Sequence, residues 1–209
     1  MKHFTKEALL TAGTAYNKNF INCLSGYKSL NLIGSINEES SETNLAPFSQ
    51  VFHIGANPPT VGILFRPHSV ERHTLENILQ NGHFTLNHVT ESFYKEAHLS
   101  SARWERSEFE ATGLKEEYLN NFIAPFVEKS PLKVACLLKD KITLAVNETV
   151  LIIGSIEEVW IKPQAVEEDG FISLDKLGTI TVSGLDSYHI ANKLARLTYA
   201  KPDKPVKEL

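Results

Sequence analysis

The sequence contains little cysteine: Cys23 and Cys136 are the only two in 209 residues, and they form no C-x-x-C pair. Two isolated cysteines give no disulfide framework, so we expect reduced thiols in a soluble, cytoplasmic protein. Long apolar runs are missing as well. The apolar patch near the N-terminus is short and contains Glu7, which predicts neither a signal peptide nor a membrane-spanning segment.

The sequence also lacks the short motifs of several enzyme classes. Its eleven glycines include no G-x-G-x-x-G and no G-x-x-x-x-G-K-[ST], which argues against Rossmann and P-loop nucleotide sites. The eight histidines form neither H-x-H nor H-E-x-x-H, so we predict surface or core roles for most of them and no metal site. A net charge of −4 gives no basic surface for nucleic acid, and we predict no such partner.

The composition that is present, 42% hydrophobic and 22% charged, is typical of one globular domain. Short strand-like segments follow one another with only short helices between them, which predicts a mainly β, barrel-type fold. The predicted strands are 29–36, 61–65, 84–89, a hairpin over 133–146 that turns at Lys139-Asp140, and 150–161. Helical spacing marks 5–15, 74–82, 91–100 and 186–197, and we expect a long excursion over 103–121. We predict a single domain over 1–209, with a helical extension at 1–20 and a frayed tail at 203–209.

The stretch 44–59, N-L-A-P-F-S-Q-V-F-H-I-G-A-N-P-P, is the most informative part of the sequence. Its apolar run from 48 to 56 predicts a buried strand, entered through a turn and left through a rigid corner, because Pro58 and Pro59 cannot donate to a sheet. Asn44, Ser49 and Asn57 place hydrogen-bonding groups beside core strands. This combination predicts a flat polar ligand lying against the barrel wall.

A second candidate site is the segment 66–74, R-P-H-S-V-E-R-H-T, just before a predicted helix. Arg66 and Arg72 ahead of the helix, with the Thr74 hydroxyl at its start, are suited to a phosphate monoester, because free amides and the helix dipole favour an anion. The alternative is that Thr74 only caps the helix and the arginines are solvated. From these residues alone both interpretations stay open.

Four motifs in order carry a family resemblance: N-L-A-P-F-S with N-P-P, then R-H-T-L-E-N-I with G-H-F-T-L-N, then S-E-F-E-A-T-G-L, then A-R-L-T-Y-A-K-P. Together, from 22 to 202, they resemble the flavin reductase-like family of FMN-binding split barrels. The resemblance implies a split β-barrel with short peripheral helices. It also implies a homodimer with one FMN per subunit near the dimer interface.

The resemblance implies that FMN is held by the stretch 44–59, by the segment 66–74 before the predicted helix, by the end of the predicted strand 84–89 and by a variable loop. The residues are Asn44, Ala46, Pro47, Phe48, Ser49, Asn57, Arg66, Arg72, His73, Thr74, Asn87, His88, Ser100, Ser101 and Arg103. For Asn87 the alternative is a strand-end asparagine that satisfies a turn. Two positions depart from the family: His73 stands where an aspartate is common, and Thr149 where many members have a histidine that is thought to face the nicotinamide.

These observations lead to an FMN-dependent oxidoreductase with NAD(P)H as the reductant and a small molecule or a protein as the electron acceptor. We nominate no catalytic side chain, because the flavin itself carries the chemistry. One alternative is a non-enzymatic, flavoredoxin-like electron carrier, which the Thr149 departure favours. The other is a barrel that has lost flavin and binds a different small ligand.

Overall fold

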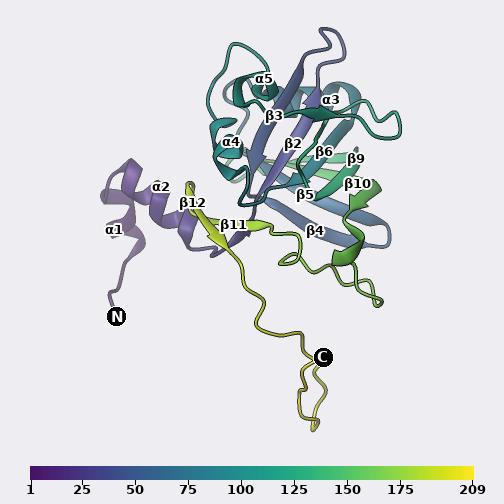
Figure 1. Cartoon of the computed structure of the whole chain (residues 1–209). Coiled ribbons are helices and arrows are strands. Elements are labelled where there is room, and N and C mark those ends of the chain that lie inside the picture. The colour runs from purple at the N-terminus through teal and green to yellow at the C-terminus, as the bar shows by residue number, and fades with distance from the viewer.

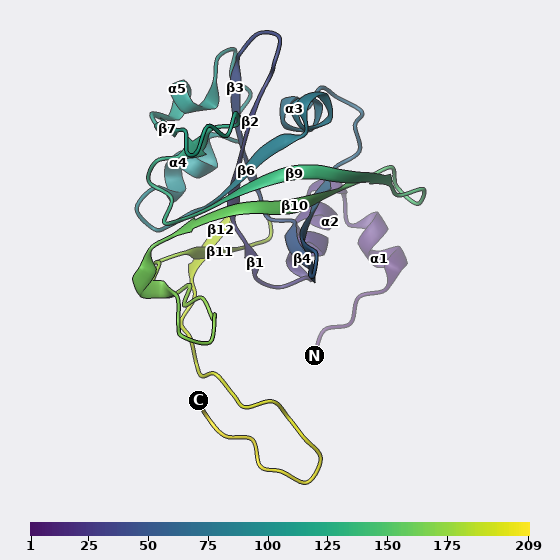
Figure 2. The ribbon, with the colours of Figure 1, turned by 90° about the vertical axis from the view of Figure 1, so that its right-hand side faces the viewer.

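The computed structural model describes all residues, 1–209, and its centre is a seven-stranded antiparallel sheet in the order β3-β2-β6-β9-β10-β5-β4 (Figure 1). The mainly β prediction is therefore confirmed. The strands of this sheet are β2 (Asn31–Ile36), β3 (Thr43–Phe48), β4 (Val51–Ala56), β5 (Pro59–Phe65), β6 (His83–His88), β9 (Leu132–Thr143) and β10 (Val150–Ile161). The sheet curves strongly, with the long strands β9 and β10 running across its middle (Figure 2).

Two smaller sheets and six short helices surround this sheet. One small sheet has the order β1-β11-β12 and the other pairs β7 with β8. Their strands are β1 (Lys28–Ser29), β7 (Glu116–Glu117), β8 (Phe126–Val127), β11 (Ile180–Ser183) and β12 (Ser187–Ile190). The helices are α1 (Lys6–Thr11), α2 (Thr14–Cys23), α3 (His73–Asn81), α4 (Tyr94–Leu99), α5 (Glu108–Thr112) and the 3-10 turn η1 (Pro163–Ala165). No helix is both long and apolar enough to cross a membrane.

Helix α3 packs on the sheet through its apolar face, where Leu75 and Ile78 are fully buried. The helix ends at Gly82, whose φ of 79° is the left-handed conformation that glycine adopts without strain. Its start differs from the prediction. Arg72, not Thr74, is the N-cap residue, and Thr74 lies buried in the first turn. The N-terminus of α3 is therefore anchored against the core at a fixed place.

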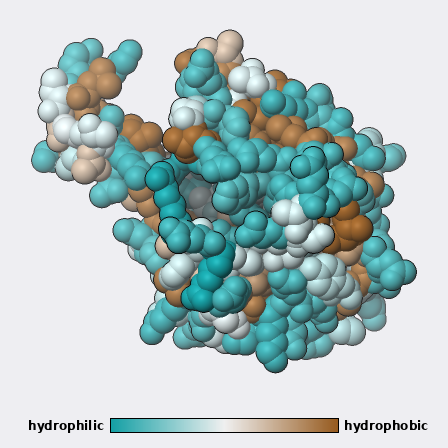
Figure 3. Space-filling view, turned by 90° about the horizontal axis from the view of Figure 1, so that it is seen from above, coloured by the Kyte–Doolittle hydropathy of each residue, from teal (hydrophilic) through white to brown (hydrophobic).

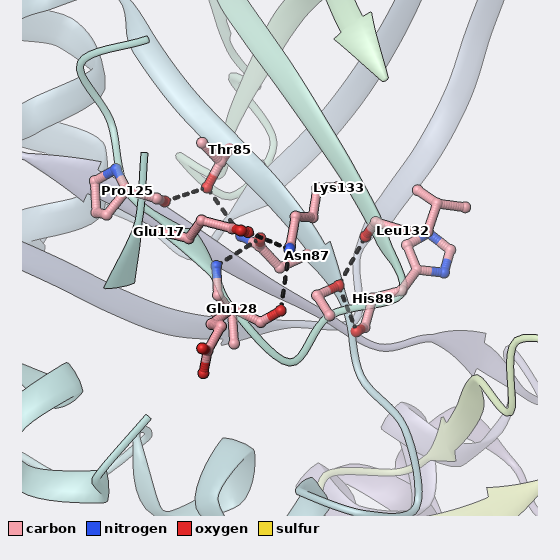
Figure 4. A network of polar contacts seen from close by, with 10 residues as sticks. Thr85, Asn87, His88, Glu117, Pro125, Glu128, Leu132 and Lys133 are labelled. Carbon is pink, nitrogen blue, oxygen red and sulfur yellow. Dashed lines mark hydrogen bonds and ion pairs between the residues drawn. The ribbon is translucent and has the colours of Figure 1, made fainter. Parts of the chain in front are cut away.

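Beneath β6 a buried polar network connects the sheet to the β7–β8 hairpin (Figure 4). The Asn87 amide donates to the Leu32 carbonyl at 3.1 Å and to the Thr85 hydroxyl at 2.9 Å, and its oxygen accepts from the Val127 amide at 2.9 Å. Beside it the Lys133 ammonium pairs with Glu117 and donates to the Glu128 carbonyl. Asn87 therefore has its side-chain hydrogen-bonding capacity used inside the fold.

Three predicted elements are wrong. Strand β9 continues through Lys139-Asp140, and the chain turns at 144–149, where Glu148 has a φ of 60°. Lys139 and Asp140 gave the wrong prediction of a turn because they lie in the exposed end of β9, where a strand needs no apolar residues. Strand β4 is an exposed edge strand, not a buried one. The segment predicted as a helix over 186–197 forms strand β12 and then an irregular chain.

Gly34 pairs in register with both neighbours of β2. A Cβ atom there would lie 2.1 Å from the Pro125 carbonyl oxygen, so close approach explains this glycine. Thr5, the first residue of the helix predicted over 5–15, caps α1, since its hydroxyl accepts from the Ala8 amide. Helix α1 projects from the body (Figure 3), and the C-terminal tail extends away from the sheets (Figure 2).

Candidate functional site

A cavity of about 560 Å³ lies where the edge strand β3, the end of β5 and the start of α3 meet. The turn after α4 and residues from distant parts of the chain complete its walls. Its volume falls within the range of about 300–1,000 Å³ that is usual for small-molecule sites. The lining residues therefore come from five or more separate segments, and the sheet holds these segments in place.

Most of the predicted site residues line this cavity. They are Asn44, Ala46, Pro47, Phe48 and Ser49 from β3 and the turn after it, Arg66, Arg72, His73 and Thr74 from the segment before and into α3, and Ser100, Ser101 and Arg103 after α4. The two motifs that we interpreted separately, as a wall and as a phosphate site, thus face one space. This convergence is a property of the fold and could not be measured from sequence spacing.

Three predicted residues lie elsewhere. Asn57 is exposed in the turn between β4 and β5, at the far end of both strands. Asn87 is fully buried in the network described above, so the alternative interpretation, a structural asparagine, matches its contacts. His88 follows it, and its ring points away from that network (Figure 4). Burial lowers the pKa of His88 to about 4, so the ring is neutral at physiological pH.

The start of α3 has three backbone amides without a partner in the chain. The first helical hydrogen bond runs from the Glu76 amide to the Arg72 carbonyl at 3.0 Å, which leaves the amides of residues 73, 74 and 75 free. The Arg72 amide is taken by the Glu76 carboxylate at 3.1 Å. Free amides at a helix N-terminus favour an anion, and His73 and Thr74 line the cavity.

Three arginines line the same cavity as this helix start. Arg66 is exposed, and Arg72 is half-buried with its Nε donating to the Pro67 carbonyl at 3.2 Å. That bond fixes the Arg72 stem and leaves its terminal nitrogens unpaired within the chain. The third arginine, Arg103, lines the cavity from the loop after α4. Guanidinium groups recognise phosphate through charge-assisted hydrogen bonds, so this end of the cavity is suited to a phosphate monoester.

Another wall of the cavity is the open edge of β3. The Leu45 amide points away from β2 and donates to the Glu108 carboxylate at 3.0 Å. Pro47, two residues further on, occupies the next position whose amide would face this open edge. Because proline has no N–H, no donor is left unpaired there. Burial raises the pKa of the Glu108 carboxyl. From the same strand the Asn44 amide donates to the Thr74 hydroxyl at 2.8 Å. This bond joins the wall to the helix start.

Sequence reasoning missed several lining residues. They are Asn22, Gln50, Leu64, Phe65, Val70, Glu71, Ala102, Glu108 and Leu185. Glu108 belongs to the S-E-F-E-A-T-G-L motif, which carries part of the family resemblance but contributed no residue to the predicted site. Asn22 lies at the end of α2 and Leu185 follows β11, and nothing in the sequence around either residue indicates that it lines the cavity. Thr149, noted as a departure from the family, does line the cavity, while its hydroxyl donates to Asn147 at 2.7 Å.

The comparisons with known proteins identify the family of this chain. The sequence profile described as the flavin reductase like domain matches residues 28–178, most of the chain. The chain belongs to the flavin reductase-like family. A search of the curated proteins finds no match. Membership supports a flavin-related oxidoreductase role for this flavin reductase-like protein.

Solved structures support the fold of this flavin reductase-like protein. A candidate flavin reductase with a split barrel domain from Shewanella frigidimarina NCIMB 400 is 48% identical, with a TM-score of 0.92, over 96% of this chain and 100% of that chain. The split-barrel prediction is therefore confirmed. The 2-nitrobenzoate 2-nitroreductase NbaA of Pseudomonas fluorescens is 22% identical, with a TM-score of 0.81 over 98% of both chains. An FMN-binding protein from Thermus thermophilus is 17% identical, with a TM-score of 0.67 over 86% of this chain and 93% of that chain. At these lower identities the likeness concerns the fold.

Proposed function

We propose that this protein binds FMN in the cavity and acts as an FMN-dependent oxidoreductase that NAD(P)H reduces. The observation that carries the proposal is the start of α3, where three free amides and the guanidinium groups of Arg66, Arg72 and Arg103 adjoin one cavity. A monophosphate matches these amides and arginines, because they are hydrogen-bond donors and the arginines carry positive charge. The family membership and the FMN-binding neighbour from Thermus thermophilus support flavin as the rest of the ligand.

The side chains of this cavity bind and orient rather than react. Arg72 and Thr74 would hold the phosphate, and the β3 wall, with Phe48 beside the Phe65 ring, would hold the flat part of the ligand. Bound FMN would supply the redox chemistry, accepting electrons from the reductant and passing them to a small molecule or a partner protein. Glu108 and Thr149 are among the other polar groups that line the same space. None of them needs to gain or lose a proton in this proposal.

A flavin carrier without its own nicotinamide site is the second candidate. The observation that favours it is Thr149, a short side chain whose hydroxyl already donates to Asn147. A carrier would bind FMN with the same residues and receive electrons from another protein. Measuring FMN reduction with NADH and with NADPH separates the two candidates. Reduction by either nucleotide supports the oxidoreductase, and a bound FMN that neither nucleotide reduces supports the carrier.

We also propose that the protein is a homodimer. An apolar outer face, defined by Phe52, Ile54, Leu64, Ile142, Leu151 and Ile153, covers four adjacent strands on the side opposite the core. Phe52 and Ile54 are 44% and 42% exposed, which is unusual for large apolar side chains lying together. Leu64 also lines the cavity, so a second copy covering this face would lie beside the ligand.

A further inference from the structure

A buried polar cluster lies behind the phosphate end of the cavity, where β2, β3 and α3 meet. Its centre is Ser35, which is 0% exposed. The Asn77 amide donates to the Ser35 hydroxyl at 3.1 Å, and the Asn44 amide lies 3.5 Å from the same oxygen. Asn44 makes its short bond, of 2.8 Å, to the Thr74 hydroxyl. Each of the three elements therefore contributes a side chain to one connected group.

Only part of this cluster reaches the proposed phosphate site. Asn44 and Thr74 line the cavity, whereas Ser35 and Asn77 do not. Ser35 therefore cannot touch the ligand that we propose, and any effect it has must pass through Asn44. Burial makes that effect large, because a buried amide that loses its acceptor must turn or remain unsatisfied.

The direction of the bonds decides what Thr74 offers to the cavity. Asn44 donates through its amide nitrogen, so the Thr74 oxygen acts as the acceptor in that bond. The Thr74 hydroxyl hydrogen is then free to donate to a phosphate oxygen. If the Asn44 side-chain amide were rotated by half a turn, its carbonyl oxygen would accept a hydrogen bond from the Thr74 hydroxyl, which would no longer be free for the phosphate. The Ser35 oxygen faces the amide nitrogens of both Asn44 and Asn77, which favours the Asn44 orientation that leaves the hydrogen free.

We propose that Ser35 is a positioning residue that, through Asn44, directs the Thr74 hydroxyl toward the phosphate of the bound flavin. The inference rests on the proposed FMN site and adds a residue outside it. In this proposal Ser35 contributes to the selectivity for a phosphorylated flavin, and it does not contact the ring system of the flavin. Loss of Ser35 should therefore weaken FMN and leave riboflavin, which has no phosphate, nearly unchanged.

The test measures the dissociation constants of FMN and riboflavin by fluorescence quenching for the wild type, Ser35→Ala, Thr74→Val and the double variant. We expect Ser35→Ala to weaken FMN about tenfold, the value of one hydrogen bond to a charged group, and to change riboflavin less than about twofold. The double variant should bind FMN no more weakly than Thr74→Val alone, because both changes remove the same bond. Additive losses, or an equal loss for both flavins, would overturn the proposal.

Two further variants make every outcome informative. Ser35→Cys keeps a weak acceptor in place and should give an FMN-to-riboflavin preference between those of wild type and Ser35→Ala, and it remains usable if the alanine variant does not fold. Ser173→Ala removes another fully buried hydroxyl, bonded to Glu167 at 2.7 Å, and should leave the preference unchanged. If the wild type itself shows no preference for FMN, the proposed function fails. If it does and the Ser35 variants keep that preference, only the Ser35 inference fails.

Discussion

The Glu108 carboxylate on α5 accepts a 3.0 Å hydrogen bond from the Leu45 amide at the open edge of β3. This contact closes one position of an edge strand that would otherwise present a free amide, and it places a carboxylate in the wall of the cavity. Glu108 is partly buried at this position, and burial disfavours the charged form of its carboxyl group and so raises its pKa.

This contact predicts a pH dependence of stability. The pKa of Glu108 is raised by burial, so between the ordinary carboxyl value and the raised one the folded state binds more protons than the unfolded state. The free energy of unfolding should therefore fall as pH rises through that window. Glu108→Gln keeps an acceptor for Leu45 and removes the titration. Urea unfolding between about pH 4 and 8 should show a smaller decline for the variant; parallel declines would contradict the assignment.

The phosphate site predicts a selective loss of affinity. Arg72→Ala combined with Thr74→Ala removes one charged and one neutral donor at the start of α3, and should weaken FMN about 100-fold while leaving riboflavin within about threefold. Arg106→Ala is the matched control, because Arg106 pairs with Glu110 at 2.9 Å and does not line the cavity. An FMN affinity that the double change leaves intact would remove the phosphate assignment.

The Asn87 network predicts a stability effect without a binding effect. Asn87→Ala leaves the Val127 amide without its acceptor and removes two further bonds, so we expect a loss of about 2–4 kcal/mol in the free energy of unfolding. The ratio of the FMN and riboflavin dissociation constants should stay at its wild-type value. A changed ratio in a folded variant would show that Asn87 acts on the ligand after all.

The apolar outer face predicts the oligomeric state. Phe52→Asp together with Ile54→Lys should convert a dimer into a monomer, because charges on this face would be buried against the second copy. Ile123→Lys is a control of similar exposure, 41%, on the loop before β8. Sedimentation velocity measures both. A wild type that is monomeric, or a dimer that tolerates the charges on β4, would refute this interface.

Local signals in the sequence were sufficient for much of the fold. Thr5 as a cap and Gly82 as a helix end are recognisable because their chemistry concerns only their own neighbours. Strand β10 has the predicted bounds, Val150–Ile161, and a register shift occurs at Gly154. A Cβ at Gly154 would lie 2.4 Å from the Phe84 ring, which no sequence pattern reveals.

The failures have physical reasons as well. Lys139-Asp140 has the composition of a turn, yet it lies in the exposed end of a long strand, where tertiary position overrides local preference. Phe52 and Ile54 have the composition of a core strand but lie on an exposed edge. Asn87 matched a ligand-facing motif, and only the positions of Leu32, Thr85 and Val127 show that its hydrogen bonds are used internally.

The central claim is tested most directly by the visible absorption spectrum of the purified protein, recorded again after FMN is added and unbound flavin is removed by desalting. The account predicts flavin bands that stay with the protein, and their loss in the Arg72→Ala, Thr74→Ala double variant. A colourless protein that releases all added FMN would contradict the account, leaving the split-barrel fold without the proposed flavin chemistry.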